Sequence, residues 1–202
     1  MDSFITAAMQ KWPAVPHCYG WLSFDRRGEW RIQNEYAQQF KLQGELIHHQ
    51  GFKEYIEAHL AHDGKGNYFF QNGPQRVFIH FSYCPWVLRF YPLEEGQWQI
   101  RTTFGEVIQP LACLLDEHGQ IIFEADFTTR VVNDEGVFLP RRVRSIGLLH
   151  DHDLEIFSAF AKVFQNHCGS LGEFLWHEKL SIEPIHSKDL PSLYHFYRNP
   201  QA

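Results

Sequence analysis

Short runs of aromatic and β-branched residues recur along the chain and predict β-strands. Such side chains suit the half-buried surface of a pleated sheet. The clearest runs span residues 68–70, 77–81, 87–91, 98–104, 111–115 and 120–123. Asn72-Gly73-Pro74 marks a turn between the first two runs. This spacing predicts a mainly antiparallel β-sheet, built from hairpins, with one face covered.

Four segments of the chain share one turn pattern: Asp or Asn, two further residues, then Gly. They begin at residues 25, 63, 116 and 133, with intervals of 38, 53 and 17 residues. The acidic or amide side chain caps a turn, and the glycine supplies positive φ where the chain enters the next strand. Each segment predicts a hairpin turn with a G1 bulge. Because the intervals share no period, we interpret the pattern as common turn chemistry and not as a repeat array.

Apolar residues at helical spacing predict three helices, over residues 3–11, 51–61 and 153–166. The second helix is indicated by Phe52, Tyr55, Ile56 and Leu60, and the third by Leu154, Phe157, Phe160, Ala161 and Phe164. The two longer helices are expected to cover the sheet. No linker or low-complexity stretch divides the chain. The expected fold is therefore α+β: one domain, residues 1–202, with a mainly antiparallel sheet covered by two amphipathic helices.

Composition narrows the classes of function. The apolar fraction is 44% and the charged fraction 21%, as in ordinary globular proteins, and the net charge is −6. A negative charge disfavours non-specific binding to nucleic acid or to acidic membrane surfaces. The N-terminus has no basic leader, and the apolar run at 111–115 is far too short to span a membrane. These features predict a cytoplasmic protein without nucleic-acid or membrane partners.

Three segments carry a resemblance to a known family. They are KWPAVPHCYGWLSFDRRGEWR from Lys11, FFQNGPQRVFIHF from Phe69 and PWVLRF from Pro85. Together they resemble an uncharacterised bacterial family of unknown function. The matching segments lie within the first half of the chain. The resemblance implies no activity and favours a bacterial, cytoplasmic setting.

Histidine is abundant, with 13 residues, and two clusters have candidate metal-ligand spacing. In an extended segment, the alternation of His150-Asp151-His152-Asp153 would place both histidines on one face. The second cluster, at the end of the middle helix, is His59, His62 and Asp63. Either cluster could hold zinc or manganese with ligands from elsewhere. The alternative is that these residues stabilise helix ends, and no cofactor is then expected.

A group of arginines is the main basic feature of this acidic chain. Arg142 and Arg144 would share one face of a strand, with Arg141 beside them. Guanidinium groups bind phosphate or carboxylate in a bidentate manner, so these three residues are candidates for anion binding. The alternative is a solvated rim of ion pairs.

Sequence motifs for specific enzyme classes are absent. The chain has no H-E-x-x-H, no G-x-S-x-G, no nucleotide-binding glycine motif and no C-x-x-C. The function stays unknown at this point. The leading hypothesis is a non-enzymatic binding or interaction domain for a small anionic ligand or a protein partner. The alternatives are a metal-dependent hydrolytic enzyme that uses a His/Asp cluster, and a homodimer subunit with an exposed apolar edge.

Overall fold

Fourteen strands and five short helices form the part of the chain that the computed structural model describes, residues 3–12, 14–132, 137–163 and 171–202. The first half contains α1 (Ser3–Lys11), β1 (Cys18–Phe24), β2 (Trp30–Ile32), α2 (Glu35–Gln39), β3 (Glu45–Leu46), α3 (Gln50–Ala58), β4 (Leu60–His62), β5 (Tyr68–Asn72) and β6 (Gln75–Phe81). A hairpin of β7 (Trp86–Pro92), η1 (Glu94–Gly96) and β8 (Trp98–Thr102) follows. The second half contains β9 (Ala112–Asp116), β10 (Ile121–Val132), β11 (Phe138–Leu149), η2 (Asp151–Asp153), α4 (Leu154–Phe160), β12 (Ala161–Val163), β13 (Gly172–Leu175), β14 (Lys179–Ile185) and α5 (Leu190–Leu193).

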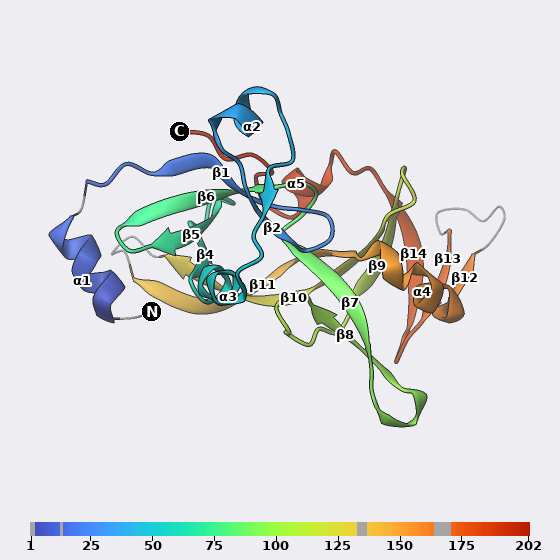
Figure 1. Ribbon diagram of the computed structural model, residues 1–202. Helices are drawn as coiled ribbons and strands as arrows, with labels where there is room; N and C mark the ends of the chain where they lie inside the picture. Colours follow the sequence, from blue (N-terminus) through green and yellow to red (C-terminus); the bar gives the residue numbers. More distant parts are fainter. Residues whose placement is uncertain (1–2, 13, 133–136, 164–170) are drawn as a thin grey trace.

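The strands form one mixed sheet, in the order β12-β13-β14-β9-β10-β4-β5-β6-β1-β2-β3, with β11, β7 and β8 branching from β10 (Figure 1). Four pairs run parallel: β1 with β6, β10 with β4, β11 with β7, and β14 with β9. Within the described residues, the strands contain more than twice as many residues as the helices. The expected α+β fold, a mainly antiparallel sheet under two helices, is therefore wrong. Parallel partners lie far apart in sequence, so local hairpin patterns do not indicate them.

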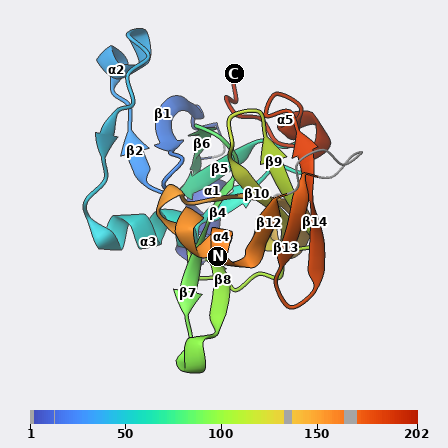
Figure 2. The same cartoon turned by 90° about the vertical axis from the view of Figure 1, so that its right-hand side faces the viewer.

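The same topology occurs twice along the chain. In the N-terminal unit (β1 to β6), a hairpin, a third strand and a helix precede a three-stranded meander, whose last strand returns parallel to the first. The C-terminal unit (β9 to β14) repeats this order, and β14 returns parallel to β9. Figures 1 and 2 show the C-terminal meander β12–β14 beside β9. The turns at 25–28 and 116–119 occupy equivalent places, so two of the shared turns mark a duplicated topology.

The helices are shorter than the sequence predicts, except for α1, which has the expected bounds. In each unit the helix passes directly into a strand, β4 after α3 and β12 after α4. Both helices place phenylalanines on the middle strand of the following meander: Phe52 packs on Phe70, and Phe157 stacks on Phe174. Residues 164–166 of the third expected helix lie outside the described residues. Within the described ranges, no helix combines the length and the apolar character that crossing a membrane requires.

The predicted hairpin turns are confirmed at three of the four positions. Asp25, Asp63 and Asp116 each cap a turn by accepting backbone N–H groups from the residues two and four positions later. Gly28 and Gly119 adopt φ of 77° and 75°, the left-handed region that this turn requires. The fourth turn, 133–136, lies outside the described residues, and the strands that flank it pair antiparallel. The six predicted strands lie in β5 to β10.

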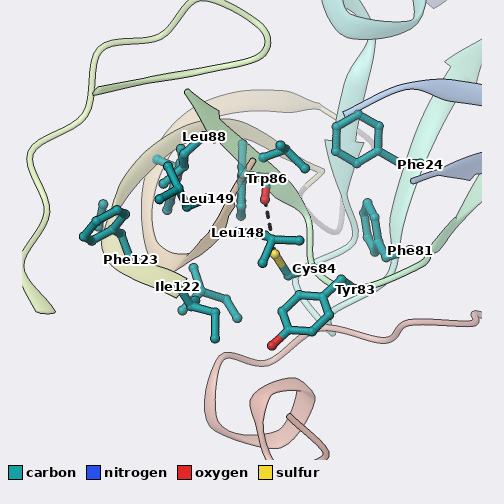
Figure 3. Close-up of a cluster of buried hydrophobic side chains, with 14 of the residues drawn as sticks. Phe24, Phe81, Tyr83, Cys84, Trp86, Leu88, Ile122, Phe123, Leu148 and Leu149 are labelled. Atoms are coloured by element: carbon teal, nitrogen blue, oxygen red, sulfur yellow. Dashed lines mark hydrogen bonds between the residues drawn. The ribbon is translucent and has the colours of Figure 1, made fainter. Parts of the chain in front are cut away.

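The main core lies where the hairpin of β7 and β8 meets both units. Trp86 and Leu88 of β7 pack with Ile122 and Phe123 of β10 and with the end of β11 (Figure 3). Phe24 and Phe81 bring β1 and β6 into the same cluster (Figure 3). Tyr83 lies beside Cys84 at the edge of this cluster, where the chain leaves the N-terminal unit (Figure 3).

Candidate functional site

A groove of about 510 Å³ lies between the two units, and three arginines line it. The N-terminal unit and the residue directly after it contribute Asp25, Arg26, Arg27, Arg31, Gln43 and Ser82, and the C-terminal unit contributes Gln120, Leu148, Leu149 and Asp151. We call this the arginine groove. Its volume falls within the range of small-molecule sites. Three guanidinium groups face two carboxylates, so the lining carries a net positive charge in an acidic protein.

Asp25 holds one of the three arginines in place. Its Oδ1 accepts the backbone N–H groups of Arg27 (2.9 Å) and Glu29 (3.0 Å), and its Oδ2 accepts Nε of Arg31 (2.7 Å). Nη1 of Arg31 also donates to the carbonyl of Gly44 (3.3 Å). The Asp25 side chain is buried, so its charge is compensated inside the protein by the turn and by Arg31. Arg31 is therefore a fixed cation in the lining of the groove.

The other two arginines lie on the exposed turn and are held weakly. Nη2 of Arg27 pairs with Oδ2 of Asp151 at 3.2 Å, and both side chains are more than half exposed. Such pairs contribute about 0–1 kcal/mol, because water competes with them. Arg26 lies over the ring of Tyr83 at 5.3 Å and pairs with no carboxylate among the described residues. Both guanidinium groups can turn toward an incoming anion at small cost.

Tyr83 connects this turn to the equivalent turn of the C-terminal unit. Its hydroxyl donates to Oδ2 of Asp116 at 2.6 Å, and both side chains are buried. Arg26 and Arg198 flank the ring at 5.3 and 5.2 Å. Burial, followed by the hydrogen bond to Asp116, raises the pKa of Tyr83, so the phenol stays protonated. Tyr83 is thus a neutral, rigid support for the side chain of Arg26, which lines the groove.

The arginines predicted from the sequence lie elsewhere, on β11. Arg144 donates to Oδ1 of Asp126 (2.7 Å) and to Oε1 of Glu124 (3.1 Å), and Arg142 donates to the carbonyl of Asp126 (3.1 Å). Arg141 is exposed. At these positions β11 pairs with β10 alone among the described strands, so the arginines lie along a sheet edge. Charged side chains at such an edge also oppose edge-to-edge association.

The histidine cluster at 150–153 is divided between two roles. The segment forms η2 and is not extended, so its side chains do not alternate. His150, Asp151 and His152 offer ligand atoms within 4.8 Å of one another, and this is the one such group within the described ranges. Asp153 is buried and points away, with a bidentate contact to Arg89 (2.7 and 3.0 Å) and a bond from the Phe90 backbone N–H (2.8 Å).

Local contacts hold the residues of the second predicted cluster separately. The ring of His59 packs on Tyr55, and its Nδ1 contacts the Tyr55 carbonyl at 2.8 Å. The Asp63 carboxylate accepts from Lys65 and Asn67 and so closes the turn. Nδ1 of His62 accepts the backbone N–H of Gly64 (3.1 Å), and burial lowers the pKa of its imidazole. Each of the three therefore has a structural contact of its own.

Exposed apolar side chains lie on and around α2, which projects at the top of Figure 1. Tyr36 and Phe40 of this segment pack against each other, with ring centroids 4.6 Å apart, and both are more than half exposed. Such a surface is compatible with the homodimer or protein partner that the sequence leaves open. Both stay predictions.

The sequence reasoning missed the arginine groove because it interpreted residues 25–28 only as turn chemistry. The available signal is the pair Arg26-Arg27 inside a hairpin turn, followed by Arg31 on the next strand. Asp151, the partner of Arg27, is 124 residues away in the sequence. No local pattern indicates that contact.

Comparisons with known proteins define the family and no activity. No curated protein matches the chain. A crystal structure of a DUF1285 family protein from Silicibacter pomeroyi DSS-3 is similar, with 12% identity and a TM-score of 0.43, over 91% of this chain and 96% of that one. A family model described as "Protein of unknown function (DUF2946)" matches residues 1–201. The resemblance to a family of unknown function is thus confirmed, and the chain belongs to this DUF2946 family.

Proposed function

We propose that this protein is a binding domain for a small anionic ligand, which it holds in the arginine groove. The observation that carries the proposal is the set Arg26, Arg27 and Arg31 at one concave site between the two units. Guanidinium groups bind phosphate and carboxylate through paired, charge-assisted hydrogen bonds. Three of them favour a group with more than one negative charge, so phosphate is the first ligand to test.

The contacts of the groove support an anion in preference to a cation. Arg31 is already fixed by Asp25, so its ordering precedes binding. Arg26 has no carboxylate partner within the described part of the chain, and Arg27 has only an exposed one. The ligand would add the missing negative charge at the place where the protein leaves it uncompensated. Ser82, Gln43 and Gln120 supply neutral hydrogen-bonding groups around it.

A metal-dependent hydrolytic enzyme remains the second candidate, because His150, Asp151 and His152 lie close together beside the same groove. The charges around this triplet oppose a bound cation. Arg27 occupies an oxygen of Asp151, and burial, followed by the charge of Arg89, lowers the pKa of His150. Zinc titration of the wild type and of a His150→Ala/His152→Ala variant tests this candidate. It requires stoichiometric uptake by the wild type that the variant loses.

The anion proposal is tested by calorimetric titration of inorganic phosphate at low ionic strength. In Arg26→Ala/Arg27→Ala we expect the phosphate affinity to fall about tenfold, the effect of one good charge-assisted contact. Both side chains are exposed, so the variant should unfold at nearly the temperature of the wild type. Added salt should weaken binding by the wild type.

The matched control is Arg141→Ala/Arg142→Ala, which removes the same charge from the other arginine group. We expect this variant to bind phosphate like the wild type. A loss in the control variant with none in the Arg26/Arg27 variant would move the site to β11. The absence of phosphate binding by the wild type would reject the proposal.

A further inference from the structure

A second cavity, of about 580 Å³, adjoins the arginine groove, and Gln43 and Ser82 line both. We call it the α2 cavity. Six of its lining residues belong to the connection between β2 and β3, which contains α2. The opposite wall comes from Gly20 and Ser23 on β1 and from His80 on β6. A ligand whose anionic group lies between the arginines would therefore extend into this cavity.

Hydrogen bonds within the protein hold the wall of the α2 cavity in place. Nε2 of Gln33 donates to the carbonyl of Leu42 (3.0 Å), and Nε2 of Gln38 donates to the carbonyl of Gln33 (3.0 Å). Gly20 adopts φ of 77°, and a Cβ there would lie 2.7 Å from Oε1 of Gln38. The positive φ favours glycine at this position, and the side chain of Gln38 from α2 lies against it. The cavity is preformed, which lowers the entropic cost of binding.

The same bonds leave acceptors and donors for a ligand. The amide groups of Gln33 and Gln38 donate through nitrogen, and their oxygens receive no donor from the described residues. The imidazole of His80 is half-buried and likewise has no hydrogen-bond partner within the described ranges. Burial lowers the pKa of His80, so near pH 7 its ring offers one donor and one acceptor. Asn199 adds a further amide at the rim.

The lining selects among classes of ligand. Apart from the imidazole of His80, no aromatic ring lines the cavity among the described residues, so a flat base has little to stack on. Six of the eleven lining residues carry amide or hydroxyl groups and one, Lys41, carries an ammonium group, and an apolar chain would leave these groups without partners. No carboxylate lines it in the described part of the chain. Hydroxyl groups, which both donate and accept, match this set of partners.

We infer that the α2 cavity binds the polyhydroxylated part of a ligand whose phosphate lies in the arginine groove, so that the ligand is a sugar phosphate. This inference rests on the proposed anion site and adds the chemical class of the ligand. His80, Gln33 and Gln38 recognise the hydroxyl groups, while Arg26, Arg27 and Arg31 hold the phosphate.

Calorimetric titration with three probes tests the inference: inorganic phosphate, ribose 5-phosphate and phenyl phosphate. For the wild type we expect ribose 5-phosphate to bind about tenfold more tightly than inorganic phosphate, as two or three added hydrogen bonds would give. Phenyl phosphate should show no such gain. His80→Phe keeps the size of the ring and removes its hydrogen bonds. This variant should bind ribose 5-phosphate several-fold more weakly and inorganic phosphate unchanged.

A matched control exists in the C-terminal unit. In the N-terminal unit, His80 pairs with Ser23, two residues before the capping Asp25. In the C-terminal unit, Glu183 pairs with Leu114, two residues before the capping Asp116, so Glu183 occupies the place equivalent to that of His80. Glu183→Ala should leave all three affinities unchanged. Equal binding of ribose 5-phosphate and inorganic phosphate would overturn the inference and leave the anion site standing. A gain with phenyl phosphate, or a sugar preference that persists in His80→Phe, would overturn it too. If no probe binds, the proposed function fails, and the inference fails with it.

Discussion

The two units share a topology and a capped turn, yet they use the turn differently. Oδ1 of Asp25 and Oδ1 of Asp116 make the same pair of backbone contacts. Oδ2 of Asp25 holds Arg31 at the groove, whereas Oδ2 of Asp116 holds the buried hydroxyl of Tyr83. One turn thus presents charge at the surface, and its counterpart anchors the core.

The two residues between the capping aspartate and the glycine also differ between the turns. Arg26 and Arg27 of the N-terminal turn correspond to Glu117 and His118 of the C-terminal turn. Glu117 binds the backbone and the hydroxyl of Ser187 (2.8 and 2.7 Å). The C-terminal turn therefore fastens the chain that follows β14, while the arginines of the N-terminal turn make only exposed contacts, with Asp151 and with the ring of Tyr83.

The connection after the hairpin is the second difference. In the N-terminal unit, twelve residues, 33–44, lead from β2 to β3 and form α2 over one end of the sheet (Figure 2). In the C-terminal unit, β10 and β11 are long paired strands instead. The α2 cavity thus has its covering segment in one unit alone. A duplicated scaffold has become asymmetric by changes at a turn and a connection, where substitutions disturb packing least.

The largest effect on stability is expected at the C-terminal turn, residues 116–119. Asp116→Ala removes two turn contacts and leaves the buried Tyr83 hydroxyl without its partner, at a cost of about 3 kcal/mol in unfolding free energy. Adding Tyr83→Phe should restore about 1 kcal/mol, because the orphaned hydroxyl is gone. The same addition to Asp25→Ala should restore nothing. Chemical denaturation of the four variants measures this, and equal restoration in both backgrounds would erase the distinction between the turns.

Exchanging turn residues between the units tests the functional side of the comparison. Arg26→Glu/Arg27→His gives the N-terminal turn the residues of its counterpart, and phosphate affinity should fall roughly 30-fold. The reverse exchange, Glu117→Arg/His118→Arg, should create no second site, because the buried Ile122 stands there in the place of Arg31. Calorimetry would show two phosphates bound to the reverse variant if arginines alone were sufficient.

Alanine substitutions at two glycines with nearly equal φ, Gly119 and Gly20, distinguish the cost of backbone strain from the cost of a steric contact. Gly119→Ala should cost about 1 kcal/mol, because alanine tolerates φ of 75° poorly and nothing lies within 4 Å of the new Cβ. Gly20→Ala adds the contact with Gln38 and should cost up to about 2 kcal/mol. It should also reduce the preference for ribose 5-phosphate. Equal destabilisation by both substitutions would show that α2 yields easily and does not define the cavity.

The smallest expected effect is on the stability of the protein at acid pH. Hydrogen bonds from Ser187 lower the pKa of Glu117 to about 2, from an ordinary value of 4.5. The unfolded chain takes up the proton first, so this contribution is complete above about pH 4.5 and is lost as the pH falls toward 2. Glu117→Gln should flatten the loss of stability across that window. An unchanged pH profile would mean that the contact with Ser187 has no effect in solution.

Local features of this fold could be predicted from the sequence, and distant ones could not. The strands and the capped turns follow from neighbouring residues, as in 68–70 and Asp116-Glu117-His118-Gly119. The return of β6 to β1 pairs Phe81 with Phe24 across more than fifty residues, with no local signal. The duplication is hidden because β10 and β11 are much longer than their counterparts β2 and β3.

The candidate site shows the same division. The sequence suggests a small anion as the ligand through Arg141, Arg142 and Arg144, which lie close together on β11. The groove depends instead on Arg26, Arg27 and Arg31 meeting Asp151 and Leu149. These residues come together because the two units pack against each other. The local sequence of neither unit indicates this packing.

The most direct test is a phosphate titration of ¹⁵N-labelled protein followed by amide chemical shifts. The account predicts saturable shifts that cluster at residues 25–31, 82, 120 and 148–151 and are absent from residues 116–119, which do not line the groove. Shifts centred on residues 141–144, or no saturable shifts at all, would contradict the assignment of the arginine groove as the anion site.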